Sequence, residues 1–381
     1  MGRLIITTQP VIFIGRDYAI NDVLDEIADA LDQRGWRVIR GWAAEPPEIT
    51  EYPEAEWSEL FGETDVAMIT VRTRLPGALL ERAPRLRGVV FPTIGTDSLD
   101  LADAKRLDII VANGATSENF ETMGESTVML MAALFLDLHA KERITRENLP
   151  RPSLSDLKAR MMRGRTIGLI GMGRIARAVV KRLQGWDVRI LAHDPYVSPQ
   201  AAPAGVQMVD MTTLLSESDL VSIHVTLTSE TRQMIGRAEL ALMKPSAFLI
   251  NTARGGAIDD DILIEALRSG KIAGAGLDVF GSEPLDPQSP LRSLPNVIVT
   301  SHMVGHTADM KDAFVAAGIE NVVRIMRGDD PLYVRNPDVL PAWRRRIATL
   351  DQRSHDGTNQ FVAGEPGKGA VSTETDRASN G

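Results

Sequence analysis

The stretch from Thr166 to Asp194 constrains the fold of this chain more than any other. It begins with an apolar run of strand type over 166–170 and passes through a glycine-rich turn into a segment with helical spacing. It ends in a second apolar run over 188–192. A strand, a tight turn, a helix and a second strand form a βαβ unit with parallel strands. Strand-like and helix-like segments alternate along most of the chain, which predicts an α/β protein with mostly parallel sheets.

The residues of this unit also predict a ligand. Gly171 permits the tight turn, and Gly173 has no side chain, so a pyrophosphate can approach the backbone. Ala176 is small enough for the helix to pack on the strand, and the free N–H groups at the helix N-terminus attract phosphate. Asp194 would accept hydrogen bonds from ribose hydroxyls and repel a 2′-phosphate, so we predict NAD rather than NADP. A tight turn that binds nothing is the alternative interpretation.

Composition narrows the class of protein. The 381 residues are enough for two domains, and the net charge of −9 argues against a nucleic-acid partner. The absence of cysteine excludes disulfides, thiolate nucleophiles and cysteine zinc sites, and we expect no metal. The sequence shows neither a signal segment nor an apolar run long enough to span a bilayer. We therefore predict a cytoplasmic protein with no membrane partner.

Three patterns follow predicted strands downstream of the βαβ unit. Arg254 follows the apolar run over 247–251, and the planar guanidinium of an arginine suits a carboxylate ligand. Asp278 ends a predicted strand, Glu283 lies in the loop after it, and His302 follows the next strand. A histidine beside a carboxylate suits proton transfer near neutral pH. Taken singly, each residue also has a purely structural interpretation, but together with a dinucleotide site they favour catalysis.

Two arginines and one loop lie at strand ends in the first third of the chain. Arg72 and Arg74 come at the end of the predicted strand over 65–71, and the loop over 93–96 follows another apolar run. Ligands of parallel sheets bind beyond the carboxyl ends of the strands, which favours substrate contacts at these positions. For both arginines, solvated surface charge is the alternative interpretation.

Several motifs occur in an order typical of one family. They are Gly-Met-Gly-Arg-Ile-Ala at Gly171, His-Asp-Pro-Tyr at His193, Val-Ser-Ile-His-Val-Thr-Leu-Thr at Val221, Asn-Thr-Ala-Arg-Gly-Gly at Asn251, Gly-Leu-Asp-Val-Phe at Gly276 and the segment around His302. The chain thereby resembles the D-isomer-specific 2-hydroxyacid dehydrogenases, which include phosphoglycerate dehydrogenases and glyoxylate-hydroxypyruvate reductases. The resemblance extends over roughly residues 65–328.

This resemblance implies two Rossmann-like domains with doubly wound parallel sheets. The NAD-binding domain, expected over 119–306, would be inserted into a discontinuous substrate domain formed by 1–118 and 307–343. The active site would lie in the cleft between them. The helix that begins near Phe120 would lie at the interface of a homodimer. The polar composition after Trp343 independently predicts a disordered tail over 344–381.

The resemblance also implies roles for individual residues. Arg254 would hold the substrate carboxylate, His302 would exchange a proton with the substrate oxygen, and Glu283 would orient His302. Residues expected to contact the cofactor are Gly171, Gly173, Arg174, Ile175, Asp194, Val225, Thr226, Thr252, Ala253, Asp278 and Gly305. Residues expected to contact the substrate are Arg72, Ile94, Gly95 and Arg254.

The expected activity is hydride transfer between the nicotinamide of NAD and C2 of a small 2-keto or 2-hydroxy acid. The glyoxylate, hydroxypyruvate and 3-phosphoglycerate classes all stay open, because Thr93, Ser301 and Thr226 depart from the residues usual in the family. An NAD(H)-sensing binding protein with little turnover is the alternative. Formate oxidation is a further candidate, against which Glu283 argues, because related formate enzymes pair the histidine with glutamine.

Overall fold

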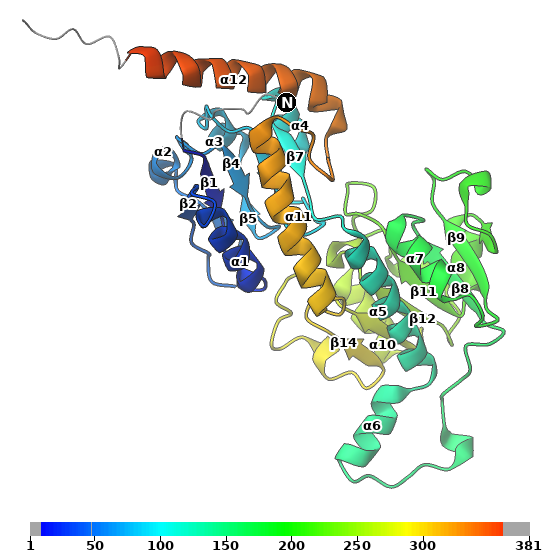
Figure 1. Cartoon of the computed structure of the whole chain (residues 1–381). Coiled ribbons are helices and arrows are strands. Elements are labelled where there is room, and N and C mark those ends of the chain that lie inside the picture. Colours follow the sequence, from blue (N-terminus) through cyan, green and yellow to red (C-terminus); the bar gives the residue numbers. More distant parts are fainter. Residues whose placement is uncertain (1–8, 47, 361–381) are drawn as a thin grey trace, which may run out of the picture.

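The computed structural model describes residues 9–46 and 48–360, and side-chain positions are described through 352. Figure 1 shows two lobes, each built on a parallel sheet, joined by long helices. The expected α/β class with two Rossmann-like sheets is therefore confirmed. The predicted domain limits at 118/119 and 306/307 stay predictions.

The first sheet is formed by the N-terminal part of the chain and has the strand order β2-β1-β4-β6-β7. Its strands are β1 (Val11–Ile14), β2 (Arg37–Arg40), β4 (Val66–Met68), β6 (Gly88–Val90) and β7 (Ile110–Ala112). All its strand pairs are parallel, as crossover helices require. A small separate sheet pairs β3 (Thr50–Glu51) with β5 (Thr73–Arg74).

The second sheet has seven parallel strands in the order β10-β9-β8-β11-β12-β13-β14. They are β8 (Thr166–Ile170), β9 (Arg189–His193), β10 (Val206–Met208), β11 (Leu220–Ile223), β12 (Phe248–Asn251), β13 (Gly274–Leu277) and β14 (Val297–Val299). The strand order reverses between β8 and β11, which pair directly. Ligands of such sheets bind in the crevice outside this switch point.

Helices cover both faces of the two sheets. Those of the first lobe are α1 (Asn21–Asp32), α2 (Trp57–Phe61), α3 (Gly77–Glu81), α4 (Leu101–Arg106), α11 (Ala308–Arg327) and α12 (Leu340–Gln360). Those of the second lobe and its approach are α5 (Ser117–Phe135), α6 (Leu138–Arg146), α7 (Arg174–Arg182), α8 (Met211–Glu217), α9 (Arg237–Leu242) and α10 (Asp260–Arg268).

Helices α5 and α11 carry the chain from one lobe to the other (Figure 1). Their starts are fixed by threonine caps, because the side chain of Thr116 accepts a hydrogen bond from Asn119 and that of Thr307 accepts one from Met310. Helix α11 packs closely on α1, where a Cβ at Gly318 would lie 2.8 Å from Ile27. These helices set the position of one sheet relative to the other and hence the width of the cleft between them.

The predicted disordered tail over 344–381 is wrong for its first part. Helix α12 runs from Leu340 to Gln360. Trp343 and Ile347 are buried in the core of the first lobe, and the indole N–H of Trp343 donates to the carbonyl of Arg87 at 2.8 Å. The segment is polar overall, but its few apolar residues recur at helical spacing and form a narrow apolar stripe on α12. Residues 361–381 lie outside the described part of the chain.

Over 9–46 and 48–360, none of the helices is both long and apolar enough to cross a lipid bilayer.

Candidate active site

The cleft between the two sheets brings together most of the residues predicted from the sequence. Its cavity has a volume of about 220 Å³ and takes lining residues from both lobes. The predicted residues that line it are Arg72, Ile94, Gly95, Ile175, Val225, Thr226, Thr252, Ala253, Arg254, Asp278, His302 and Gly305. Five others do not line this cavity: Gly171, Gly173, Arg174, Asp194 and Glu283.

Glu283 lies directly behind His302. The imidazole Nδ1 is 2.7 Å from Glu283 Oε2, and because a carboxylate only accepts, Nδ1 is the donor. Burial alone would raise the pKa of Glu283, but the hydrogen bond from His302 and the nearby positive charges hold that pKa below its usual value. With Nδ1 occupied, Nε2 is the ring nitrogen left for exchange with a ligand in the cleft.

The backbone around His302 is held in a conformation that few residues adopt. His302 has a φ of 55°, in the left-handed region, and its N–H donates to the carbonyl of Asp278 at 2.7 Å. The buried carboxylate of Asp278 accepts from the Thr300 hydroxyl at 2.6 Å and from the N–H groups of Met303 and Val304 at 2.9 and 3.1 Å. Asp278 therefore fixes the loop that presents the histidine.

Arg254 follows β12 and reaches across the cleft to the loop after β6. Its Nε and Nη2 donate to the same oxygen of Asp97, at 3.1 and 3.0 Å, and its Nη1 donates to the carbonyl of Ala253 at 2.7 Å. A Cβ at Gly95 would lie 2.5 Å from Arg254 Nη2, so a larger residue at position 95 would displace the guanidinium from this position.

Arg72 enters the cleft from the first lobe and is held by two carboxylates. Its Nη1 lies 3.2 and 3.3 Å from the two oxygens of Asp17, and its Nη2 lies 3.7 Å from Glu283 Oε2. The guanidinium also lies over the ring of Tyr18, 4.8 Å from its centroid. Burial alone would lower the pKa of Arg72, but Asp17 and Tyr18 outweigh burial and raise it. Arg74, by contrast, is outside the cleft and pairs with Glu51 at 2.6 Å.

The glycine-rich turn after β8 fits the phosphates of a dinucleotide. Gly171 has a φ of 91°, and a Cβ there would lie 2.7 Å from the carbonyl oxygen of His224. A Cβ at Gly173 would meet nothing within 4 Å, which shows open space at the N-terminus of α7. Asp194 lies next to this turn, because its Oδ2 accepts from Met172 N at 2.8 Å.

Comparison with known proteins decides the family. Residues 128–304 match the model of the "D-isomer specific 2-hydroxyacid dehydrogenase, NAD binding domain". A glyoxylate reductase of Thermococcus litoralis is 34% identical over 293 residues, which are 76% of this chain and 88% of that enzyme. The chain belongs to the D-isomer-specific 2-hydroxyacid dehydrogenases. It is an oxidoreductase of this NAD(P)-dependent family, and small 2-keto acids are typical substrates there.

Two further proteins similar to this dehydrogenase show how much of the chain is shared. A D-3-phosphoglycerate dehydrogenase of Methanocaldococcus jannaschii is 34% identical over 77% of this chain, but this chain spans only about half (55%) of that enzyme. The crystal structure of the TT0316 protein of Thermus thermophilus superimposes with a TM-score of 0.73 at 29% identity, covering 85% of this chain and 99% of that one.

Sequence reasoning missed several polar residues of this dehydrogenase's cleft. His224 and His306 line the cavity, and so does Asp17. Burial lowers the pKa of His224 to about 4, and its Nε2 is buried without a hydrogen-bond partner. Burial and the neighbouring His302 lower the pKa of His306. All of these follow strand ends, and Asp97 lies in the loop after β6. The rule that ligands bind beyond the carboxyl ends of parallel strands, which was applied to Arg72, therefore also includes these residues. The sequence alone does not show which strand ends lie together.

Proposed function

We propose that this protein is an NAD-dependent dehydrogenase that transfers a hydride between the nicotinamide and C2 of a small 2-keto or 2-hydroxy acid. The substrate belongs to the glyoxylate, hydroxypyruvate or 3-phosphoglycerate class, in line with the names of the relatives above. The observation that carries the proposal is the meeting of Arg254 with the His302–Glu283 pair at one cleft. An arginine for the carboxylate and a histidine for the keto oxygen are the two groups that this reaction needs.

The residues of the chain divide the work as follows. The nicotinamide, when bound, supplies the hydride that arrives at C2. His302 Nε2 gives a proton to the substrate oxygen in reduction and takes it back in oxidation. Glu283 stabilises the charged imidazole and fixes its orientation through Nδ1. Arg254 binds the carboxylate and polarises the neighbouring carbonyl. Arg72, Ile94 and Gly95 line the opposite wall, where the remainder of the substrate would lie.

The cofactor would lie along the carboxyl edge of the second sheet. Gly171, Gly173, Arg174 and Ile175 would contact the pyrophosphate at the start of α7. The nicotinamide end would be contacted by Thr252, Ala253, Asp278 and Gly305, and the adenine end by Val225 and Thr226.

We propose NAD rather than NADP, because the carboxylate of Asp194, which accepts from Met172 N beside the glycine-rich turn, would bind the adenosine ribose hydroxyls and repel a 2′-phosphate. Asp194→Ala should raise the ratio of NADPH-dependent to NADH-dependent kcat/KM by about tenfold or more. An unchanged ratio would contradict this role of Asp194.

A panel of 2-keto acids tests the activity directly. Initial rates of NADH oxidation with glyoxylate, hydroxypyruvate, pyruvate, 2-ketoglutarate and 3-phosphohydroxypyruvate should show clear turnover of at least one of them. His302→Asn should lower kcat by about 10²–10⁴-fold and leave NADH affinity nearly unchanged, because the histidine acts in proton transfer. Silence of the wild-type chain across the panel, with NADH still bound, would instead favour a cofactor-sensing protein.

We also propose that the chain forms a homodimer through the segment 129–161. Helix α6 in this segment projects away from both lobes (Figure 1). Seven of the fifteen exposed large hydrophobic side chains among the described residues lie in it: Met129, Leu136, Leu138, Leu149, Leu154, Leu157 and Met161. Such a concentration of exposed apolar surface marks a protein–protein interface.

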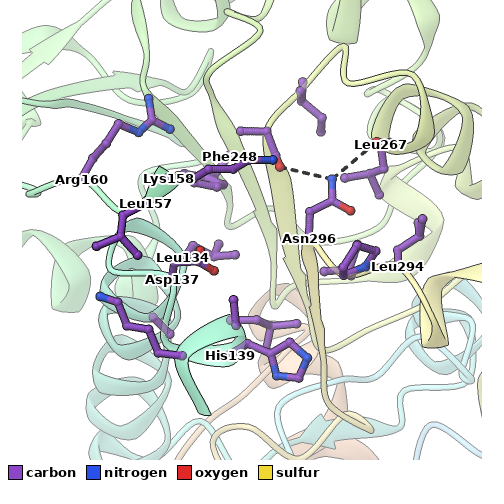
Figure 2. A pocket seen from close by; sticks show the side chains of 18 of the residues that line it. Leu134, Asp137, His139, Leu157, Lys158, Arg160, Phe248, Leu267, Leu294 and Asn296 are labelled. Atoms are coloured by element: carbon purple, nitrogen blue, oxygen red, sulfur yellow. Dashed lines mark hydrogen bonds between the residues drawn. The ribbon is translucent and has the colours of Figure 1, made fainter. Parts of the chain in front are cut away.

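The hollow beside this segment supports the same proposal. It measures about 920 Å³ and lies between the α6 segment and the edge of the second sheet, with Leu157 and Arg160 on one side and Leu294 and Asn296 on the other (Figure 2). Leu154→Arg should convert the dimer to a monomer in light scattering after gel filtration, because Leu154 is 84% exposed. Leu242→Arg, on α9 outside the segment, is the matched control. A monomeric wild-type chain would contradict the proposal.

A further inference from the structure

The guanidinium of Arg254 is already partly occupied. An arginine carries five N–H donors in a planar arrangement. Asp97 takes the Nε–H and one N–H of Nη2, and the carbonyl of Ala253 takes one N–H of Nη1. One N–H on Nη1 and one on Nη2 are left. The Nη1/Nη2 edge is therefore the edge that a second carboxylate can use.

We propose that Asp97 is a positioning residue for the substrate carboxylate. By holding the Nε/Nη2 edge of Arg254, it turns the Nη1/Nη2 edge toward the substrate. This inference rests on the proposed function, which makes a 2-keto acid the ligand of Arg254. Asp97 itself touches neither the substrate nor the cofactor in this arrangement.

The loop that carries Asp97 is shaped to the guanidinium. Besides its 2.5 Å approach to Arg254 Nη2, a Cβ at Gly95 would lie 2.7 Å from Val71 and 3.2 Å from Asp97 Oδ2. Asp97 follows β6 of the first lobe, and Arg254 follows β12 of the second, so the contact also joins the two walls of the cleft. The guanidinium of Arg254, a residue of the second lobe, is thus held in place by a residue of the first lobe.

Asp97 cannot favour binding of the substrate carboxylate through charge attraction. Its carboxylate neutralises Arg254, so its own charge repels an incoming anion. The gain must come from orientation, and an amide oxygen, which also accepts hydrogen bonds, can supply the same orientation. Asp97→Asn should therefore preserve binding that Asp97→Ala loses.

The test is the binding of oxamate, an unreactive isostere of a 2-keto acid, to the NADH-loaded chain, followed by calorimetry. Asp97→Ala should weaken oxamate binding by about tenfold or more, and Asp97→Asn should stay within about threefold of wild type. In the Arg254→Ala background, Asp97→Ala should cause no further loss, because the two residues act as one unit. Glu51→Gln, which breaks an exposed ion pair outside the cleft, is the matched control.

Steady-state kinetics give a second readout in the same variants. With the preferred keto acid, Asp97→Ala should raise KM by about tenfold and leave the NADH affinity unchanged. NADH affinity and thermal unfolding show that the variants are folded.

Three outcomes would overturn the inference. One is oxamate binding to Asp97→Ala as tight as, or tighter than, binding to wild type, which would make Asp97 a competitor of the substrate. Another is an equal loss in the Arg254→Ala background, which would make its effect independent of Arg254. The third is a failure of Asp97→Asn to restore binding. Oxamate results as expected, with no turnover of any keto acid, would refute the proposed function and leave this contact in place.

Discussion

Arg72 and Arg254 face the same cleft from opposite walls, and carboxylates hold them in different ways. Arg72 is held by Asp17 of its own lobe, whose side chain is completely buried, and it also approaches Glu283. Arg254 is held by Asp97 of the other lobe, and this pair is partly exposed. Arg72 is therefore fixed whatever the position of the second lobe, whereas the orientation of Arg254 depends on how the two lobes meet. On this difference we propose that Arg254 binds the substrate carboxylate and that Arg72 has a largely structural role.

Among the residues of this comparison, the largest effect is expected from the loss of Arg254. Arg254→Gln removes the only proposed two-point contact to the substrate carboxylate and a donor beside the developing charge. We expect kcat/KM for the preferred keto acid to fall by about 10²–10³-fold. NADH affinity, measured by fluorescence, should change little. A smaller loss than that caused by Arg72→Gln would reverse the comparison.

A methyl group at residue 95 should disturb the same arginine without removing it. Gly95→Ala would place a Cβ 2.5 Å from Arg254 Nη2, so the guanidinium must move. Because a shift of about 1 Å in a positioning group can cost about 10²-fold, we expect kcat/KM to fall by about 10–100-fold. The unfolding temperature should fall only modestly, because the flexible end of Arg254 gives way and the remaining close contact is with Val71, 2.7 Å from the new Cβ. Unchanged kinetics would mean that Arg254 binds substrate in another orientation.

Arg72→Gln should affect stability at least as clearly as catalysis. It leaves the carboxylate of Asp17 buried, with the Thr70 hydroxyl and the Ala19 N–H as its remaining partners in place of the arginine. We expect a loss of about 2–4 kcal/mol in the free energy of unfolding. We expect only about a tenfold loss in kcat/KM, because both terminal nitrogens already face protein carboxylates. Denaturant unfolding and steady-state rates measure the two effects. A catalytic loss without destabilisation would assign Arg72 to the substrate.

The cofactor side of the site could be predicted from the sequence because its determinants are local. The strand, turn and helix around Gly171 and Gly173 impose their own geometry, and the same chain segment carries Asp194. The pairing of His302 with Glu283 came from the family resemblance, and the structure places their atoms at hydrogen-bond distance.

The substrate side could not be predicted to the same depth because its contacts join distant segments. Asp97 and Arg254 are 157 residues apart, and Asp17 and Arg72 are 55 apart. Which strand ends lie together depends on the order of strands in each sheet and on the packing of α5 and α11. Local sequence patterns predict neither of these. The tail prediction failed for another reason. Composition describes a whole segment, whereas a few buried residues such as Trp343 suffice to dock α12.

The smallest effect is expected at Arg74, which the sequence groups with Arg72. Arg74 lies in β5, 53% exposed, and forms an ion pair with Glu51 outside the cleft. Exposed ion pairs contribute at most about 1 kcal/mol to stability. Arg74→Gln should therefore change the free energy of unfolding by less than about 1 kcal/mol and leave kcat/KM unchanged. The decisive substrate for this variant is 3-phosphohydroxypyruvate, whose phosphate either arginine is a candidate to bind. A selective loss of activity toward it in Arg74→Gln would mean that β5 moves into the cleft when substrate binds, and the contrast between the two arginines would then hold only for the free enzyme.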